Sequence, residues 1–328
     1  WHRIAEDFDY VFYTRTGNKQ MTNPQLSEDF DRERQADDNW NISELVQVPE
    51  EPLGDGAFGE VLLMKSLRND RVYAVKFPKN PRNTPEAQER RNEMELLVNQ
   101  LLRNRNPPNL AVVHNLYWSC DPNSKRPCRF AIVMDRYPTN LTNAVELDDP
   151  QADCVCFWKW TKEVHAGLMY MHTQLSPDGP VLHRDVKPDN VLLDRMGGRD
   201  ATAYLADFGL SCVGRPTGPR RIQYGTPGFK APEIVARDEH GEKADLYSLG
   251  VLAWWLDGND IEGTTASTET DIPPERISER LRETVEVSAR QGASLTDFVQ
   301  RLICLNPVDR MGHEEILGHP YFVERPAD

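Results

Sequence analysis

Residues 181–190 read VLHRDVKPDN, a stretch that places six polar or charged side chains directly after two apolar residues. Asp, Asn and Pro are ordinary loop formers, so one interpretation is a charged turn exposed to solvent. The other interpretation is a site at which Asp185, Lys187 and Asn190 converge on one reacting group. A site of that kind requires partner motifs elsewhere in the chain.

Length and composition limit the possible answers. The 328 residues are enough for two packed lobes, and the hydrophobic content of 39% predicts a folded core. The formal net charge of -14 would repel phosphate backbones and anionic membranes, so we expect no nucleic-acid or lipid partner. The longest apolar run, LGVLAWWL at 249–256, is too short for the ~20 residues of a bilayer span, and we expect a soluble protein.

The six cysteines show no zinc-ligand or redox spacing, and we interpret most of them as reduced, buried thiols. The exception is Cys120 with Cys128, where a turn could bring two strand ends together and allow a disulfide in an oxidising compartment. Because the chain begins with Trp1, we expect a fragment or a processed form. The localisation is left open: cytoplasmic is favoured, and a secreted or organellar effector is the alternative.

The distribution of residue types along the chain predicts two lobes preceded by an extension. Residues 1–44 are rich in aromatic and acidic residues without a period, and we interpret them as an extension that docks through its aromatics, recruits partners or stays partly mobile. Residues 45–135 contain short β-rich runs and one helical segment, whereas helices dominate residues 136–328. Apolar residues at helical spacing predict one buried face of a helix: Phe157, Trp160, Val164, Leu168 and Met171.

The segment LGDGAFGEV at 53–61 carries Gly54, Gly56 and Gly59 between two strand-like runs. Glycines at this spacing let backbone amides approach phosphate oxygens, although the same pattern also marks tight turns. A dinucleotide-binding fold would continue into a helix, whereas this segment continues into a strand. That difference favours a flap over nucleotide phosphates.

Lys76 lies inside the otherwise apolar strand VYAVKF. It is either a charge at a sheet edge or a cation directed inward at anionic oxygens. A buried lysine would need an acidic partner, and the helix predicted from Pro85 onward offers Glu93 and Glu95. Periodicity alone does not choose between these two acids.

Further motifs follow the decapeptide. YLADFGL places Asp207 after an apolar run and just before Gly209, as expected of a magnesium ligand at the end of a strand. YGTPGFKAPE at 224–233, DLYSLG at 245–250 and Arg310 come next. The glycine flap, AVK, HRDVKPDN, DFG, APE, DxxSxG and the late Arg, in this order, resemble a eukaryotic protein kinase from about residue 50 to residue 322.

The resemblance implies an α+β, bilobal kinase fold, in which the small β-rich N-lobe carries one regulatory helix and the larger C-lobe is mainly helical. It also implies transfer of the ATP γ-phosphoryl group, with Lys76 on the phosphates and an acid of the helix as its partner. Kinases show Asn-Glu four residues before an apolar residue, and this pattern selects Glu93. Asp185 would orient the substrate hydroxyl and Lys187 would stabilise the transferred group, while Asn190 and Asp207 would hold Mg²⁺.

The resemblance further implies an adenine site and a substrate class. Met134 would be the gatekeeper at the end of the strand FAIVM. The cofactor-binding set is Leu53, Gly54, Gly56, Gly59, Val61, Ala74, Lys76, Met134, Asp135, Tyr137 and Leu192. Lys187 and Thr226 resemble kinases that phosphorylate serine and threonine in proteins. The acidic surface and Asp189 suggest a preference for basic peptides, which a peptide library without Arg or Lys enrichment would contradict.

One position departs from the family pattern. The usual phosphorylated residue of the activation loop, four residues before Thr226, is Ile222, so we expect activity that does not strictly depend on phosphorylation there. The alternative to an active kinase is a pseudokinase that serves as a scaffold or allosteric partner. Pseudokinases usually lack one of four residues that are all present here: Lys76, Asp185, Asn190 and Asp207.

Overall fold

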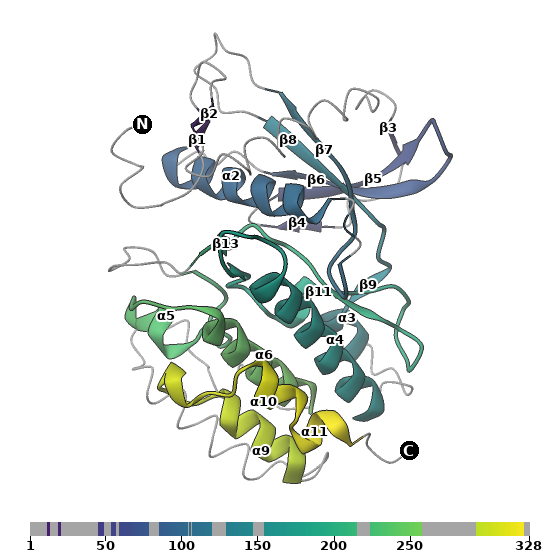
Figure 1. Cartoon of the computed structure of the whole chain (residues 1–328). Coiled ribbons are helices and arrows are strands. Elements are labelled where there is room, and N and C mark those ends of the chain that lie inside the picture. Colours follow the sequence, from purple (N-terminus) through teal and green to yellow (C-terminus); the bar gives the residue numbers. More distant parts are fainter. Residues whose placement is uncertain are drawn as a thin grey trace. The chain divides into compact units, whose positions relative to one another are not determined.

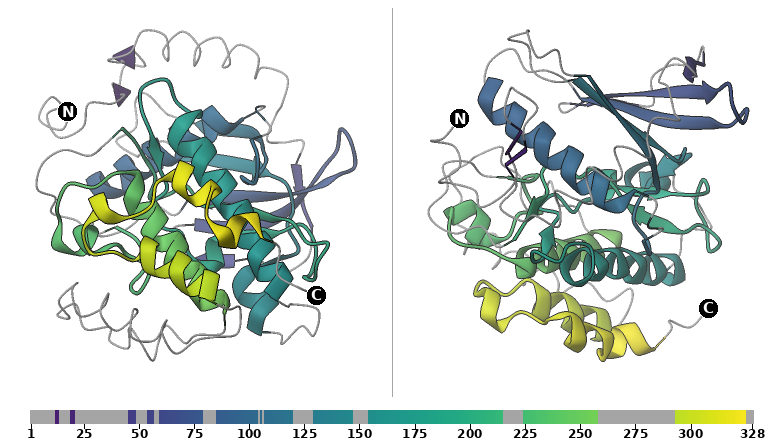
Figure 2. Two further views of the ribbon diagram at one scale, coloured as in Figure 1. Left: turned by 60° about the horizontal axis from the view of Figure 1, so that its bottom comes forward. Right: turned by 45° about the horizontal axis from the view of Figure 1, so that its top comes forward.

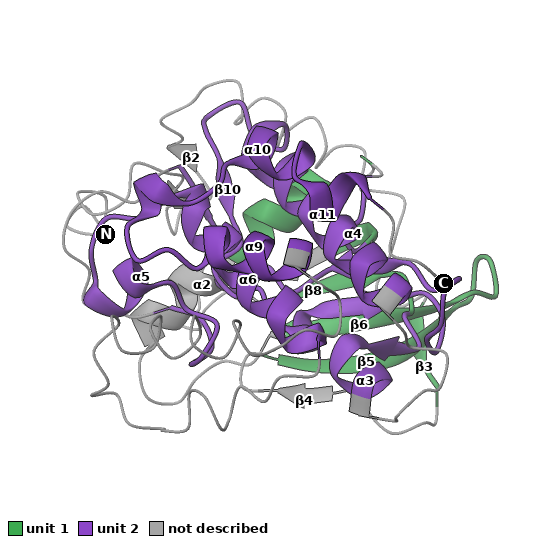
Figure 3. Ribbon diagram, turned by 90° about the horizontal axis from the view of Figure 1, so that it is seen from below, with its two compact units in different colours: residues 1–106, 112–136 green, residues 107–111, 137–328 purple. Residues whose placement is uncertain are grey.

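The structure is a computed structural model of the whole chain. The residues that it describes are 12–13, 19–20, 45–48, 54–56, 59–78, 85–103, 105, 107–119, 129–146, 154–214, 224–257 and 293–324. The chain divides into two compact units, which Figure 3 colours separately: unit 1 comprises residues 1–106 and 112–136, and unit 2 comprises residues 107–111 and 137–328.

Unit 1 is built on an antiparallel sheet with the strand order β3-β5-β6-β8-β7, to which β4 adds by pairing with β5 (Figure 1). The strands are β3 (Leu45–Gln47), β4 (Gly54–Gly56), β5 (Gly59–Ser66), β6 (Val72–Pro78), β7 (Val113–Ser119) and β8 (Arg129–Met134). Side chains on one face of this sheet form a cluster of Leu45, Tyr73, Val75, Ala131 and Val133. The alternation of strand residues leaves Lys76, next to Val75, on the opposite face.

Unit 1 also contains one long helix, α2 (Pro85–Leu102). It begins at a proline, as helices often do, because the first helical N–H needs no intrahelical partner. Its second half is buried at Leu97, Val98 and Leu101. Within the predicted extension, residues 1–44, the structure describes a short antiparallel pair, β1 (Phe12–Tyr13) and β2 (Lys19–Gln20).

Unit 2 is mainly helical (Figures 1 and 2). Its described helices are α3 (Leu141–Glu146), α4 (Cys154–Thr173), α5 (Pro232–Ala236), α6 (Glu242–Leu256), α9 (Ala293–Leu302), α10 (His313–Leu317) and α11 (Pro320–Val323), with short 3₁₀ turns η4 (Pro188–Asn190) and η5 (Pro307–Asp309). On α4, Trp160, Val164, Leu168 and Met171 are fully buried, so the face predicted from spacing is the one that packs. Helix α6 is buried on nearly all sides.

Two small sheets of unit 2 carry the functional loops. Strands β9 (Thr139–Asn140), β11 (Val191–Leu193) and β12 (Ala203–Leu205) form one sheet in the order β12-β11-β9. Strands β10 (Val181–Leu182) and β13 (Cys212–Val213) form the other. The decapeptide 181–190 therefore begins on β10 and ends where β11 starts.

Segment 107–111 groups with unit 2 although it lies in sequence between α2 and β7. The backbone explains this assignment: the N–H of Ala111 donates to the carbonyl of Leu205 at 2.9 Å, and the N–H of Leu205 donates to the carbonyl of Asn109 at 2.9 Å. The spacing of residues in the sequence did not predict these two hydrogen bonds. The predicted fold class, a β-rich lobe with one helix followed by a larger helical lobe, is confirmed.

The described residues bear on two further expectations. Cys156, Cys212 and Cys304 are free thiols, whereas Cys120 and Cys128 lie outside the described residues. Among the described helices, none combines the length and the apolar character that crossing a bilayer requires.

Candidate active site

The predicted glycine flap is a β-hairpin. Strand β4 pairs with the start of β5, with Gly54 opposite Val61 and Gly56 opposite Gly59. The pairing places the three glycines around one tight reversal, as the continuation into a strand predicted. Leu53 lies outside the described residues.

Lys76 is a buried cation with a buried partner. On β6 it is 7% exposed, and its Nζ lies 2.5 Å from Oε1 of Glu95, which is 3% exposed. The sequence argument selected Glu93 as the partner, and this choice is corrected to Glu95. The side chain of Glu93 lies outside the described residues.

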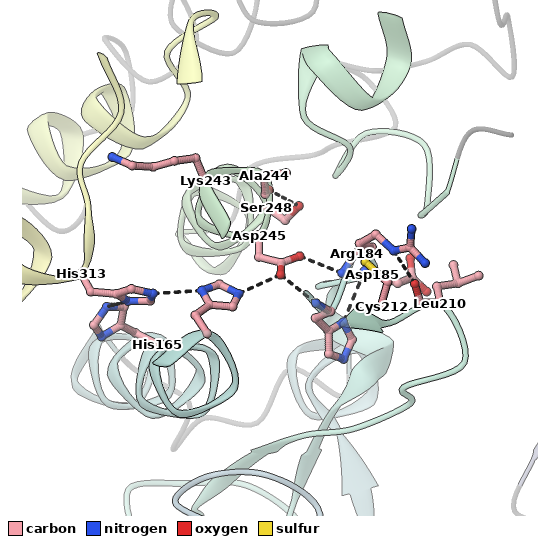
Figure 4. A network of polar contacts seen from close by, with 12 residues as sticks. His165, Arg184, Asp185, Leu210, Cys212, Lys243, Ala244, Asp245, Ser248 and His313 are labelled. Atoms are coloured by element: carbon pink, nitrogen blue, oxygen red, sulfur yellow. Dashed lines mark hydrogen bonds and ion pairs between the residues drawn. The ribbon is translucent and has the colours of Figure 1, made fainter. Parts of the chain in front are cut away.

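Asp245 of α6 binds the backbone at the start of residues 183–190, called the catalytic loop below (Figure 4). Its Oδ2 accepts the N–H of His183 at 2.7 Å and its Oδ1 accepts the N–H of Arg184 at 2.7 Å. Arg184 has a φ of +65°, a left-handed conformation that is unfavourable for a side chain of its size. The two hydrogen bonds to one buried carboxylate hold this strained conformation in place, directly before Asp185.

Burial raises the pKa of the Asp245 carboxyl, but the hydrogen bond from His172, together with His183 and the Arg184 N–H, lowers it below its ordinary value overall. Asp245 is therefore a carboxylate that only accepts hydrogen bonds. These contacts make Asp245 a structural tether of the catalytic loop.

Asp185 is the centre of a cluster of polar side chains. Its Oδ1 accepts a hydrogen bond from Oγ1 of Thr226 at 2.7 Å, and its Oδ2 accepts one from Nδ2 of Asn190 at 3.0 Å. Nζ of Lys187 lies 3.7 Å from Oδ2. The structure thus brings together the three residues of the decapeptide that the sequence singled out. Asp185 itself is 6% exposed, which fixes its carboxylate in one orientation.

Asn190 and Asp207 are the predicted magnesium ligands. The Nδ2 of Asn190 also donates to the Asp185 carbonyl at 2.8 Å. With Nδ2 used in this way, the side-chain oxygen of Asn190 is the atom left for a ligand. The N–H of Ala206, the residue before Asp207, donates to the carbonyl of Asn190 at 2.8 Å, so the backbone ties the two positions together.

The side-chain oxygens of Asn190 and Asp207 are suitable ligands for a magnesium ion. Mg²⁺ prefers hard oxygen ligands and usually takes one or two from the protein, with phosphate oxygens and water completing the shell. One carboxylate and one amide oxygen meet that requirement. Asp207 has a φ of +64° and its Oδ1 accepts the N–H of Gly209 at 3.2 Å, which fixes the carboxylate at the start of the DFG segment.

The loop after the DFG segment returns to Arg184. The Arg184 side chain donates from Nε to the Leu210 carbonyl at 2.6 Å and from Nη2 to the Ser211 carbonyl at 3.1 Å. Its guanidinium carbon lies 4.0 Å from the centre of the Tyr224 ring. Ile222, the residue at the usual phosphorylation position, lies outside the described residues, as does Thr217.

Gly225 shows why this loop requires a glycine. It has a φ of +89°, and a Cβ at this position would lie 2.7 Å from the Arg184 carbonyl oxygen. The loop therefore passes directly over the catalytic backbone. This close approach places Thr226 within reach of Asp185.

The predicted adenine contacts fall in both units. In unit 1, Ala74 lies opposite Met134 in the sheet, and Val61 lies opposite Lys76. Nε2 of His114 lies 2.7 Å from Oδ1 of Asp135, so the Asp135 side chain contacts β7, the edge strand of the sheet.

In unit 2, the rings of Tyr137 and Tyr204 lie 5.1 Å apart, and Tyr204 is the cross-strand partner of Leu192. The contacts of Tyr137 and Leu192 with adenine stay predictions.

Two further contacts of unit 2 are structural. Arg310 and Glu233 form a buried bidentate ion pair with distances of 2.5 and 2.7 Å. The hydroxyl of Ser248 on α6 donates to the Phe229 carbonyl at 2.7 Å, which ties α6 to the segment that carries Thr226. Both features support the loops without contacting Asp185.

The sequence analysis did not assign three features of the site: Glu95, Lys230 and a run of three histidines. Glu95 was weighed and not chosen. Lys230 was not considered, although its pKa is lowered by burial against the attraction of Asp185. The third is the run of histidines His165, His313 and His172 that leads to Asp245, which sequence spacing could not reveal because His313 is about 140 residues away from the others.

A sheet unit with a buried Lys–Glu pair, together with a helical unit in which Asp185, Lys187 and Asn190 are clustered, defines a protein kinase domain. Residues 48–322 match the family model described as protein kinase domain, so the chain belongs to this family.

The chain is similar to named kinases of the same family. It is 27% identical over 279 residues to Aurora kinase A-B of Xenopus laevis, covering 83% of this chain and 61% of that protein. It is 29% identical over 280 residues to the Aurora kinase of Schizosaccharomyces pombe, covering 83% and 70%. It is 30% identical over 167 residues to serine/threonine-protein kinase PLK4 of Drosophila willistoni, covering 51% and 19%. These relatives place the chain in the eukaryotic protein kinase superfamily, serine/threonine type.

Proposed function

We propose that this chain transfers the γ-phosphoryl group of ATP to serine and threonine hydroxyls of protein substrates. The observation that carries the proposal is the cluster around Asp185, in which Thr226, Asn190 and Lys187 surround one carboxylate on a loop held by Asp245. Phosphoryl transfer needs positioned groups and charge neutralisation rather than covalent catalysis by the protein. A fixed carboxylate beside an ammonium supplies both requirements.

Asp185 orients the substrate hydroxyl and accepts its proton as the new phosphate ester forms. Hydrogen bonds from Thr226 to Oδ1 and from Asn190 to Oδ2 fix the plane of the carboxylate, and each oxygen keeps lone-pair capacity for the hydroxyl. Lys187 stabilises negative charge on the transferred group. Lys76, oriented by Glu95, binds α- and β-phosphate oxygens.

Asn190 and Asp207 hold Mg²⁺, which neutralises charge on the phosphate oxygens when it is bound. The glycine hairpin of β4 and β5 covers the phosphates, because glycines let backbone N–H groups approach closely. Val61, Ala74 and Leu192 would contact the adenine ring, and the backbone from Asp135 to Tyr137 would bind its edge. Leu53 and Met134 complete the proposed adenine set.

A scaffold without catalysis is the alternative that the sequence raised, and no observation favours it. All the groups named above have the chemistry that transfer requires, and Lys76 and Asp185 are each held by charged or polar partners.

Transfer of labelled phosphate from Mg-ATP to a generic protein substrate tests the proposal. We expect the wild type to transfer phosphate and Asp185→Asn to lose at least ~10³-fold in kcat, because the proton acceptor is removed. Asp194→Asn is the matched control, since Asp194 is exposed and its carboxylate accepts the Thr202 N–H at 2.8 Å. Equal activity of wild type and Asp185→Asn, with both folded, would contradict the proposal.

A further inference from the structure

We propose that His313 is a positioning residue for the catalytic loop, acting through His172 and Asp245. The inference rests on the proposed kinase function. It concerns the run of three imidazoles His165, His313 and His172, called the histidine chain below, which joins α4 and α10 to the carboxylate of Asp245.

The histidine chain is continuous in hydrogen bonds (Figure 4). Nε2 of His165 lies 3.0 Å from Nδ1 of His313, and Nε2 of His313 lies 2.9 Å from Nδ1 of His172. Nε2 of His172 lies 2.9 Å from Oδ2 of Asp245. His165 and His172 are seven residues apart on α4, which places them on the same face two turns apart, and His313 bridges them from the first turn of α10.

Only one arrangement of protons satisfies these contacts with neutral rings. Asp245 is a carboxylate, so Nε2 of His172 must donate to it. A neutral imidazole that donates from Nε2 accepts at Nδ1, so Nε2 of His313 must donate to His172. The same rule makes Nε2 of His165 donate to His313. Every ring therefore carries its proton on Nε2, and each donates toward Asp245.

The surroundings keep the rings of His165 and His313 neutral. Burial lowers the pKa of His165 to about 3, with the charges of His313 and His172 adding to the effect. Burial lowers the pKa of His313 to about 4; His172 and Lys243 act in the same direction, and Glu242 and Asp245 oppose them. The ring of Phe322 on α11 lies edge-on to His165 at 5.1 Å and covers the outer end of the chain.

The inner end of the histidine chain is the tether of the catalytic loop. The oxygen of Asp245 that accepts from His172 is the one that also accepts the His183 N–H, and its other oxygen holds the strained Arg184. Rotation of this carboxylate would release the loop backbone two residues before Asp185. His172 fixes the carboxylate, and His313 fixes the ring of His172, because it supplies the only donor that the structure gives to the buried Nδ1 of that ring.

Removal of His313 would leave Nδ1 of His172 as a buried acceptor without a donor. A buried acceptor that loses its partner is unfavourable, and the ring can relieve this by moving its proton to Nδ1 or by rotating. Either change removes the donor from Asp245. We therefore expect His313→Ala to lower kcat by about tenfold, while KM for ATP stays within about twofold, since Lys76 and Glu95 are not affected.

Two variants separate positioning from general destabilisation. His313→Gln keeps an N–H donor close to the position of Nε2, so it should restore at least half of the wild-type kcat. His319→Ala is the matched control: His319 is also buried on the C-terminal segment and also contacts a carboxylate, Asp297, at 2.8 Å. Because His319 has no bond to Asp245, its removal should lower stability and leave kcat within about twofold.

Steady-state kinetics of the full chain and its three variants, measured with Mg-ATP and a generic protein substrate, give the first test. A loss of kcat in His313→Ala that His313→Gln rescues and His319→Ala does not reproduce supports the proposal. It is overturned if His313→Ala keeps kcat within twofold, if His313→Gln is as impaired as His313→Ala, or if His319→Ala shows the same loss.

The second test does not depend on activity. Two-bond ¹H–¹⁵N spectra of chain labelled with ¹⁵N-histidine distinguish the Nε2–H tautomer from the Nδ1–H tautomer. We expect Nε2–H for His172 in the wild type and in His313→Gln. A protonated or Nδ1–H His172 in the wild type overturns the proposal. If the wild type transfers no phosphate, the proposed function fails, and this spectrum still decides the proton arrangement.

Discussion

Lys76, which we propose binds the nucleotide phosphates, is a cation on a strand whose neighbours Ala74 and Val75 are core residues. An ammonium in such surroundings needs a compensating charge, and Glu95 supplies it at 2.5 Å. The side chains of Lys76 and Glu95 are 9% and 4% exposed, so solvent screens this ion pair little. Loss of one partner removes this compensating charge from the other.

Glu95→Gln should therefore lower the free energy of unfolding by about 3 kcal/mol. It should also lower kcat/KM for ATP by roughly tenfold or more, because Lys76 loses its orientation. Urea unfolding and steady-state kinetics measure the two effects. Glu93→Gln is the control on the same helix and should change each by much less. The reverse result, with Glu93→Gln the damaging change, would restore the choice of Glu93.

Arg184 is the residue on which our expectation about loop phosphorylation rests. In kinases that this chain resembles, the corresponding Arg binds a loop phosphate, whereas here the aromatic ring of Tyr224 lies over the guanidinium at 4.0 Å. A buried cation–π contact contributes up to about 2 kcal/mol. Phosphatase-treated protein should thus keep its activity.

Variants of Tyr224 sharpen this expectation. Tyr224→Phe keeps the ring and should retain kcat within about twofold, whereas Tyr224→Leu should lower it about fivefold, which corresponds to ~1 kcal/mol. Kinetics on dephosphorylated samples measure the difference. Complete loss of activity after phosphatase treatment, with a phosphorylated residue mapped in the loop, would show that a phosphate and not the ring positions Arg184.

At the scale of elements, α6 is the support on which unit 2 is organised. It carries Asp245 at its start, and Gly250 one turn later faces α9. A Cβ on Gly250 would lie 2.7 Å from Cβ of Leu302, which is fully buried. The glycine of DLYSLG is therefore explained by the close approach of two helices and not by any backbone requirement.

Gly250→Ala should destabilise the protein by about 1–3 kcal/mol, because overpacking outweighs the ~1 kcal/mol that alanine gains in helix propensity. Chemical denaturation measures this change. Gly318→Ala, where a Cβ would meet its nearest atoms only at 3.7 Å, is the control and should be nearly neutral. A neutral or stabilising Gly250→Ala would mean that α6 and α9 separate easily.

For the whole molecule, the histidine chain predicts how stability depends on pH. The folded-state pKa values of His165 and His313, about 3 and about 4, lie below the ordinary value of 6.5. Between pH ~4 and pH ~6.5 the unfolded chain therefore binds more protons than the folded chain. The corresponding stability is fully present above pH ~6.5 and is lost as pH falls toward ~4.

His165→Gln isolates this contribution, because glutamine keeps a donor for His313 and does not titrate. The groups around His165 are His313 and His172 and the ring of Phe322, so the variant leaves the carboxylates of the site in place. Between pH 6.5 and 4.5 the wild type should lose up to about 1.4 kcal/mol per pH unit more than the variant. Urea titrations across this range measure the slopes, and parallel slopes would show that His165 takes up its proton without unfolding.

The order of motifs was sufficient to predict the fold and the residues around Asp185, because local strings carry the loop chemistry. Contacts between distant segments were not accessible in the same way. Glu93 and Glu95 both fit the helix pattern, and only the packing of α2 on the sheet distinguishes them. The histidine chain likewise joins residues from α4 and α10, and no spacing rule relates them.

The measurement that tests the central claim most directly is mass spectrometry of a protein substrate incubated with Mg-ATP and either wild-type chain or Asp185→Asn. The account predicts phosphoserine and phosphothreonine formed by the wild type and none formed by the variant. No phosphorylated residue with a folded wild type, or modification confined to tyrosine, would contradict it.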